Sequence, residues 1–144
     1  MIADLVRVTD DGVFPASREK VWKLIEAHQN NIQAIHPAVK SAKLLRMEGN
    51  SAVVEQQYDM NGQATKMVLK VTPSPPDRLT LEFLEGPLTG KMINNYSDVP
   101  GGTKVVTECD MNSKFMDDNQ VQSTTKQFLS TAFDDDVRYL KTMK

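Results

Sequence analysis

Residues able to perform acid–base or metal chemistry are few and widely spaced in this sequence. There are two histidines, His28 and His36, and one cysteine, Cys109. The histidines lie eight residues apart with a helix break expected between them, and the cysteine is far along the chain. This spacing fits no common set of metal ligands, so we expect neither a metal site nor a cofactor. GxSxG, HExxH and P-loop patterns are absent from the sequence.

A run of carboxylates, Asp134 to Asp136, lies in a segment expected to be helical. Successive residues of a helix point about 100° apart, so we expect these side chains not to converge on one site. His36 is the acid–base candidate, because it could titrate or hydrogen-bond a ligand carbonyl.

Composition predicts one soluble domain over residues 1–144. The chain has 40% hydrophobic and 25% charged residues and a net charge of −2. No basic stripe is evident, so no nucleic-acid partner is expected. No apolar run reaches the roughly 20 residues of a membrane span, and the start does not resemble a signal peptide. A lone cysteine cannot form an intrachain disulfide, which favours a cytoplasmic location.

The first third of the sequence predicts a strand and two short helices. The strand covers Ile2 to Phe14, which is rich in Val and Thr. Ser17 is the expected N-cap of a helix that begins at Arg18 and carries Trp22 on its apolar face. A second short helix must stop near His36, because the following proline disfavours helix in the residue before it.

From Val39 onward the hydrophobic period changes to two, which predicts six further strands joined by short turns. Asn61-Gly62 and Pro100-Gly101-Gly102 are the strongest turn signals. The last segment, Asp118 to Met143, has an apolar stripe with helical spacing. One apolar sheet face and one apolar helix stripe can bury each other. The sequence therefore predicts an α+β fold, a curved antiparallel sheet that grips a long C-terminal helix.

Three motifs in the expected order resemble the START-like superfamily, also called Bet v 1-like or SRPBCC. The first is the stretch from Phe14 to Ile25, in which Pro-Ala-Ser precedes a helix with Val-Trp. Ile35-His36-Pro37 and the turn from Gly101 to Val105 are the second and third. The stretch from Glu85 to Gly90 is also similar to a turn of the quinone-binding branch.

The resemblance implies a helix-grip fold, with a seven-stranded sheet, two short helices after the first strand, and a cavity between sheet and C-terminal helix. Family members carry lipids, hormones or polyketides, and some branches cyclise or dehydrate a polyketide. Alternation along the strands, combined with this geometry, gives the candidate ligand-binding residues. They are Trp22, Ile35, His36, Tyr58, Met60, Met67, Leu69, Phe83, Met92, Asn94, Tyr96 and Phe128.

Asn94 and Tyr96 stand out among these candidates because they place polar atoms on an otherwise apolar face. Such groups orient a ligand in an apolar pocket, or they bond to each other and to the backbone. The inward positions of the strands carry no carboxylate or histidine. We therefore expect binding or transport of a small hydrophobic ligand, such as a lipid, an isoprenoid or quinone, or a polyketide, rather than turnover.

Two alternatives stay open. In a cyclase or dehydratase, the pocket would hold a reactive chain while Tyr58, Tyr96 or His36 moves a proton. In a protein-interaction module, the cavity would be collapsed and the outer surface would bind a protein partner.

Overall fold

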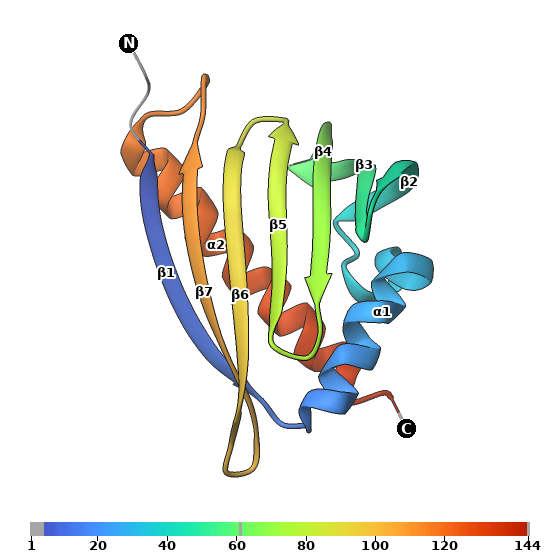
Figure 1. Cartoon of the computed structure of the whole chain (residues 1–144). Coiled ribbons are helices and arrows are strands. Elements are labelled where there is room, and N and C mark those ends of the chain that lie inside the picture. The colour runs from blue at the N-terminus through green and yellow to red at the C-terminus, as the bar shows by residue number, and fades with distance from the viewer. Residues whose placement is uncertain (1–4, 61, 144) are drawn as a thin grey trace.

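The computed structural model describes residues 5–60 and 62–143, and their strands form one sheet. Seven antiparallel strands follow the order β1-β7-β6-β5-β4-β3-β2, with α1 between β1 and β2 and α2 at the end of the chain (Figure 1). The elements are β1 (Val6–Phe14), α1 (Arg18–Ile35), β2 (Val39–Glu48), β3 (Ser51–Met60), β4 (Gln63–Ser74), β5 (Arg78–Glu85), β6 (Thr89–Val99), β7 (Gly102–Asn112) and α2 (Asp118–Leu140).

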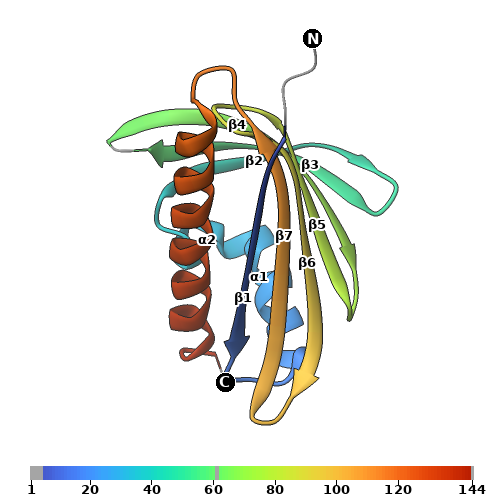
Figure 2. The same cartoon turned by 90° about the vertical axis from the view of Figure 1, so that its left-hand side faces the viewer.

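The sheet curves around α2. Register shifts interrupt the β2–β3 and β4–β5 ladders, and such irregularities bend a strand and increase its twist. Figure 2 shows α2 along one side of the sheet, with β3 and β4 reaching across at one end. The backbone of α2 approaches β1 most closely among the strands, followed by β7. The far strands stand off from the helix, and this separation leaves room for side chains between them.

One helix, α1, takes the place of the two predicted short helices. Ser17 is its N-cap, as predicted, and its hydroxyl accepts a hydrogen bond from the backbone N–H of Lys20. Asn31 has non-helical angles (φ −129°, ψ 27°), so the break is a kink rather than a separating loop. His36 ends the helix, and its N–H donates to the carbonyl of Ile32.

The long C-terminal helix begins as its sequence predicts. Asp117 is the N-cap and forms a capping box with Gln120, through bonds of 2.8 and 3.0 Å. Such a cap stabilises a helix by about 1 kcal/mol. The helix ends at Leu140, three residues before the predicted end. Of the predicted hairpin turn, Asn61 lies outside the described residues, whereas Gly62 has φ +86°.

The core forms two clusters along α2. The first cluster surrounds the N-terminal half of the helix and contains Val8, Met67, Leu69, Phe83, Leu88, Met92, Cys109, Met111, Val121 and Leu129. The second lies where α1 packs on the sheet and contains Phe14, Val21, Trp22, Leu24, Ile35, Tyr96, Val105 and Leu140. Neither α1 nor α2 is long and apolar enough to cross a membrane.

Cys109 lies in the first cluster and is fully buried on β7. Burial raises the pKa of its thiol to about 12, with smaller contributions from Asp110 and Asp10. The thiolate, which is the nucleophile, is therefore scarce at neutral pH.

We predict that Cys109 of the folded chain resists an aromatic disulfide reagent at about pH 8. The released aromatic thiol, followed by absorbance, should report one reactive thiol per chain in denaturant and a rate at least about 100-fold lower without denaturant. The Cys109→Ala variant provides the blank in both conditions. Equal rates with and without denaturant would contradict this burial.

Candidate functional site

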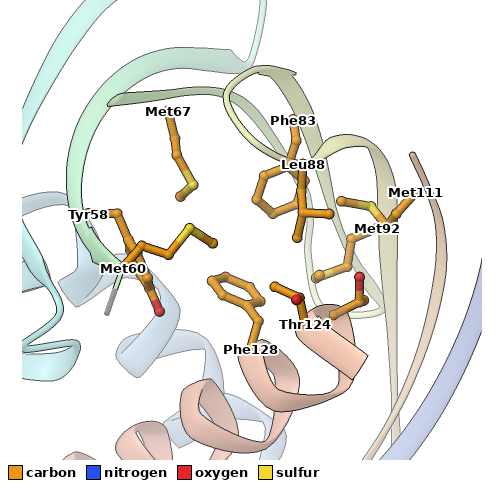
Figure 3. Close-up of a pocket in the computed structure, with 10 residues that line it drawn as sticks. Tyr58, Met60, Met67, Phe83, Leu88, Met92, Met111, Thr124 and Phe128 are labelled. Atoms are coloured by element: carbon orange, nitrogen blue, oxygen red, sulfur yellow. The ribbon is translucent and has the colours of Figure 1, made fainter. Parts of the chain in front are cut away.

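A small apolar cavity lies between the sheet and the N-terminal half of α2 (Figure 3). Its volume is about 20 Å³, enough for about one or two water molecules. Ten residues line it: Tyr58, Met60, Met67, Phe83, Leu88, Met92, Met111, Thr124, Thr125 and Phe128.

Strand alternation positions most of the lining. Five strands, β3 to β7, supply it, because residues two apart on a strand face the same side of the sheet. Four of the ten lining residues are methionines: Met60, Met67, Met92 and Met111. Methionine is unbranched and adapts its shape, so these side chains can repack around an inserted molecule.

Phe128 contacts the two other aromatic residues of the lining, Tyr58 and Phe83. Its ring centroid lies 5.9 Å from that of Tyr58 and 6.0 Å from that of Phe83, in tilted and edge-on arrangements. Such pairs contribute about 0.5–1.5 kcal/mol each beyond the area they bury. In Figure 3 the ring points from α2 toward the sheet. The side chain of Phe128 therefore closes the cavity on the side of α2, and it can move by changing only two torsion angles.

Thr125 is one of the few polar residues that line this apolar cavity. Its side chain is 1% exposed, and its hydroxyl oxygen has no hydrogen-bond partner among the described residues. A buried hydroxyl without a partner costs about 1–3 kcal/mol. A bound molecule with one oxygen or nitrogen atom near Thr125 would remove that cost.

Among the ten lining residues, Tyr58 is the only one with an ionisable side chain. Burial raises the pKa of its phenol, and the charges of Asp135 and Asp59 raise it further. Tyr58 therefore stays protonated at neutral pH and can serve as a hydrogen-bond donor rather than as a base. The ten lining residues include no carboxylate and no imidazole.

Six of the twelve residues predicted as ligand-binding line the cavity: Tyr58, Met60, Met67, Phe83, Met92 and Phe128. Leu69 packs in the same core cluster without lining the space. Asn94 has its polar atoms committed within the sheet, since it accepts from Thr107 (2.8 Å) and donates to the carbonyl of Leu79 (3.3 Å).

Three further predicted residues belong to the second core cluster. The indole N–H of Trp22 donates to the carbonyl of Pro76 at 2.8 Å, and its ring meets that of Tyr96 edge-on at 5.7 Å. Burial strongly raises the pKa of Tyr96, and Asp136 adds to the shift. With Ile35, these side chains join α1 to the sheet, and none of them reaches the cavity.

The prediction that the histidines lie too far apart to act together is wrong. The Nε2 atoms of His28 and His36 are 2.9 Å apart, and Oδ1 of Asp136 is 3.1 Å from that of His36. The kink at Asn31 and the end of α1 at His36 turn the two rings toward each other. The expected divergence of the carboxylates is also wrong, because Asp135 meets the other nitrogen, Nδ1, of His36 at 3.2 Å.

This polar cluster shifts the pKa values of its members. Burial lowers the pKa of His36, but the nearby carboxylates of Asp136 and Asp135 outweigh burial and raise it above its ordinary value. Burial likewise opposes ionisation of Asp136, but the two histidines hold its pKa below the ordinary value.

Sequence reasoning missed four lining residues: Leu88, Met111, Thr124 and Thr125. A signal existed for Thr125, because it is a polar residue within the apolar stripe of α2. Met111 continues the inward alternation of β7. Leu88 lies in the turn between β5 and β6, where no period operates.

No family model matches the sequence, and no curated protein does. Solved structures do resemble it. Ara h 8.0201 has a TM-score of 0.80 at 14% identity, over 96% of this chain and 99% of that chain. A START superfamily protein from Mycobacterium smegmatis has the same four values. The Zhui aromatase/cyclase from Streptomyces sp. R1128 has a TM-score of 0.74 at 14% identity, over 94% and 91%. The chain thus has the predicted START-like or Bet v 1-like helix-grip fold.

We predict that Thr125→Val stabilises the chain or leaves it unchanged, by 0 to about 1 kcal/mol, because valine keeps the shape and removes an unpaired hydroxyl. Thr103→Val is the matched control. Thr103 is equally buried, but its hydroxyl donates to the carbonyl of Ala16 at 2.8 Å. The control should lose about 1–2 kcal/mol in urea unfolding. A larger loss in Thr125→Val than in Thr103→Val would contradict the unpaired state of Thr125.

Proposed function

We propose that this chain binds a small, mostly apolar molecule with one hydrogen-bonding oxygen atom between the sheet and α2. Thr125 carries the proposal, because it has an unpaired hydroxyl among the described residues and belongs to a lining that is otherwise almost wholly apolar. An apolar site with a few polar groups that set orientation is the usual form of a small-molecule pocket. A carbonyl or ether oxygen of the ligand would accept the Thr125 hydrogen bond.

Binding requires the lining to open. A space of about 20 Å³ holds little more than water, so the ligand must displace the methionines that fill the site. Burial of about 300 Å² of apolar ligand surface would contribute about 7–8 kcal/mol before entropy costs. Part of that gain is spent on repacking, and micromolar affinity is the expected result.

Binding fits the chemistry of the site better than catalysis does. One similar structure is that of an aromatase/cyclase. The lining of this chain, however, offers only hydroxyl groups, and the raised pKa of Tyr58 keeps its proton in place. The imidazole of His36 is held by Asp135 and Asp136 instead of facing the cavity. General acid–base catalysis needs a group that gains and loses a proton near neutral pH.

A protein-interaction module is the second candidate, and the small volume of the cavity favours it. Large apolar side chains on the edge strand β2 are exposed, with Leu44 and Met47 each at 56%. A chain whose interior never opens would use such a surface rather than its cavity.

The first test is native mass spectrometry of the protein as purified, followed by extraction of any bound molecule. The second uses a matched pair of probes, 2-acetylnaphthalene and 2-ethylnaphthalene, which differ in one carbonyl oxygen. Methyl NMR of the labelled methionines should show that both probes perturb Met60, Met67, Met92 and Met111. Because only the ketone accepts from the hydroxyl, Thr125→Val should weaken its binding about fivefold to tenfold and leave the hydrocarbon unchanged.

The two candidate functions, ligand binding and protein interaction, predict different results in these tests. Equal loss for both probes in Thr125→Val would remove the hydrogen bond from the proposal and leave only apolar burial. Absence of a co-purified molecule, together with unperturbed methionine methyls across a wider panel of quinones and fatty acids, would overturn the binding proposal in favour of the interaction module.

A further inference from the structure

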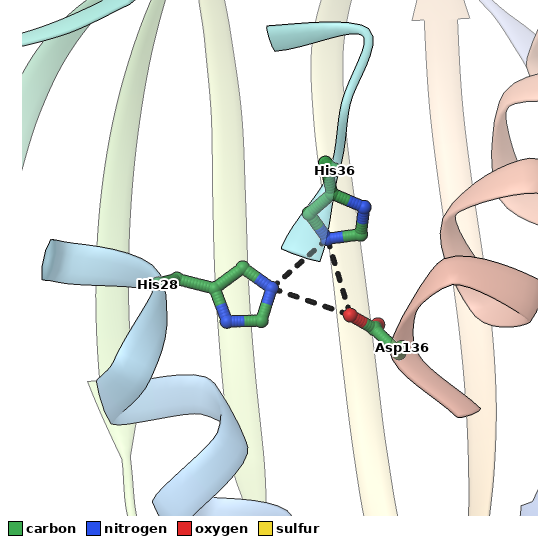
Figure 4. Close-up of side chains that lie close together, drawn as sticks. All are labelled: His28, His36 and Asp136. Carbon is green, nitrogen blue, oxygen red and sulfur yellow. Dashed lines mark hydrogen bonds and ion pairs between the residues drawn. The ribbon is translucent and has the colours of Figure 1, made fainter. Parts of the chain in front are cut away.

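Three side chains outside the cavity direct ligand atoms to one point between the two helices (Figure 4). His28 comes from α1, His36 ends α1, and Asp136 comes from α2. The distance between the two Nε2 atoms is 2.9 Å. Oδ1 of Asp136 lies 3.3 Å from Nε2 of His28 and 3.1 Å from Nε2 of His36.

The hydrogen-bond partners of the two Nδ1 atoms show which nitrogen of each ring carries a lone pair. Nδ1 of His28 lies 2.8 Å from the carbonyl oxygen of Leu24, and Nδ1 of His36 lies 3.2 Å from Oδ2 of Asp135. A carbonyl and a carboxylate oxygen only accept hydrogen bonds, so both Nδ1 atoms carry the hydrogen. In the neutral rings, each Nε2 therefore presents a lone pair. While both rings are neutral, these two lone pairs and the carboxylate of Asp136 bring three electron-rich atoms together, and they repel one another unless a proton or a metal ion lies between them.

A proton does not satisfy this arrangement. An added proton on one Nε2 can bridge the two rings, but it serves only that pair. Oδ1 of Asp136 is buried and has no hydrogen bond among the described residues, although both nitrogens are within 3.3 Å. The ring N–H directions do not point at this oxygen. A central metal ion, by contrast, would accept a lone pair from all three atoms.

The spacing matches metal coordination. With bonds of about 2.0–2.1 Å, two ligand atoms are about 3.3 Å apart at a tetrahedral angle and about 2.9 Å apart at a right angle. The observed separations of 2.9, 3.1 and 3.3 Å span this interval.

The surroundings also resemble those of a metal site. Histidine ligands usually donate their second N–H to a carbonyl or carboxylate, which fixes the ring and raises its basicity. Leu24 and Asp135 supply these acceptors here. Asp135 is held in turn by Arg138, which also donates to the carbonyl of Ile35 at 3.3 Å.

We propose that His28, His36 and Asp136 form a binding site for a divalent transition-metal ion, of which Zn²⁺ is the natural probe. Two imidazoles and one carboxylate suit Zn²⁺ and its first-row neighbours rather than Ca²⁺ or Mg²⁺. Side-chain exposures of 26%, 15% and 21% leave a route for the ion to enter. None of the three residues lines the apolar cavity, so this site is independent of the proposed ligand.

The test uses the untagged full chain after dialysis against a chelator and then against buffer. Isothermal titration should give one Zn²⁺ per chain with micromolar or tighter affinity. Asp136→Asn and His36→Gln should each weaken binding at least tenfold. Asp134→Asn is the matched control, since Asp134 belongs to the same acidic run but is exposed and stands outside the cluster. Its affinity should equal that of the parent chain.

A second readout remains informative if a variant folds poorly. The chain has only two histidines, so both imidazole signals in ¹H–¹⁵N NMR report on this site. Stoichiometric Zn²⁺ should shift the Nε2 resonances of His28 and His36 and leave each Nδ1 protonated. Unshifted histidine signals in the parent chain would overturn the proposal, as would equal Zn²⁺ affinity in Asp134→Asn and Asp136→Asn.

Discussion

Packing of a straight helix against a curved sheet is the constraint from which the other features of this structure follow. The apolar stripe of α2 is buried over β1 and β7, which it approaches closely, while the strands from β6 to β3 bend away from it. A helix of 23 residues is about 34 Å long and cannot follow that curve. The space that remains must be filled by long side chains. Methionines and aromatic rings on the far strands fill it almost completely.

The two core clusters differ in how they pack against α2. Around the C-terminal half, α1 covers the helix and the sheet. There the indole N–H of Trp22 donates to a backbone carbonyl, and burial keeps the phenol of Tyr96 protonated. Around the N-terminal half, no second helix of the described part of the chain covers the space, and four flexible methionines line it. Rigid packing at one end and adaptable packing at the other follow from the single position of α1 in the chain.

Some residues with buried polar groups are not explained by side-chain packing alone. Thr103 and Thr107 each donate to a fixed acceptor, as buried hydroxyls normally do. Among the described residues Thr125 has no acceptor, although it is as buried as Thr103. The histidine and aspartate cluster between α1 and α2 is the second such place, where His28, His36 and Asp136 converge. These are the two places at which we propose that a species binds.

Local spacing in the sequence predicts most of the elements and the side of each strand that faces inward. Alternation in β4 to β7, the Ser17 and Asp117 caps and the apolar stripe of α2 depend on local spacing, which the order of residues records directly. The same alternation placed Met67, Phe83 and Met92 on the inner face. It could not tell Asn94, whose amide bonds within the sheet, from a residue that faces the cavity.

Contacts between side chains of different elements depend on how those elements pack in three dimensions. His28 and Asp136 are 108 positions apart, and they meet because α2 packs against α1. Leu88 reaches the cavity from a turn, where no period operates. The volume of the cavity likewise depends on how far the sheet curves from the helix. Local patterns carry no information about these distances, because they arise from the packing of segments that are remote in sequence.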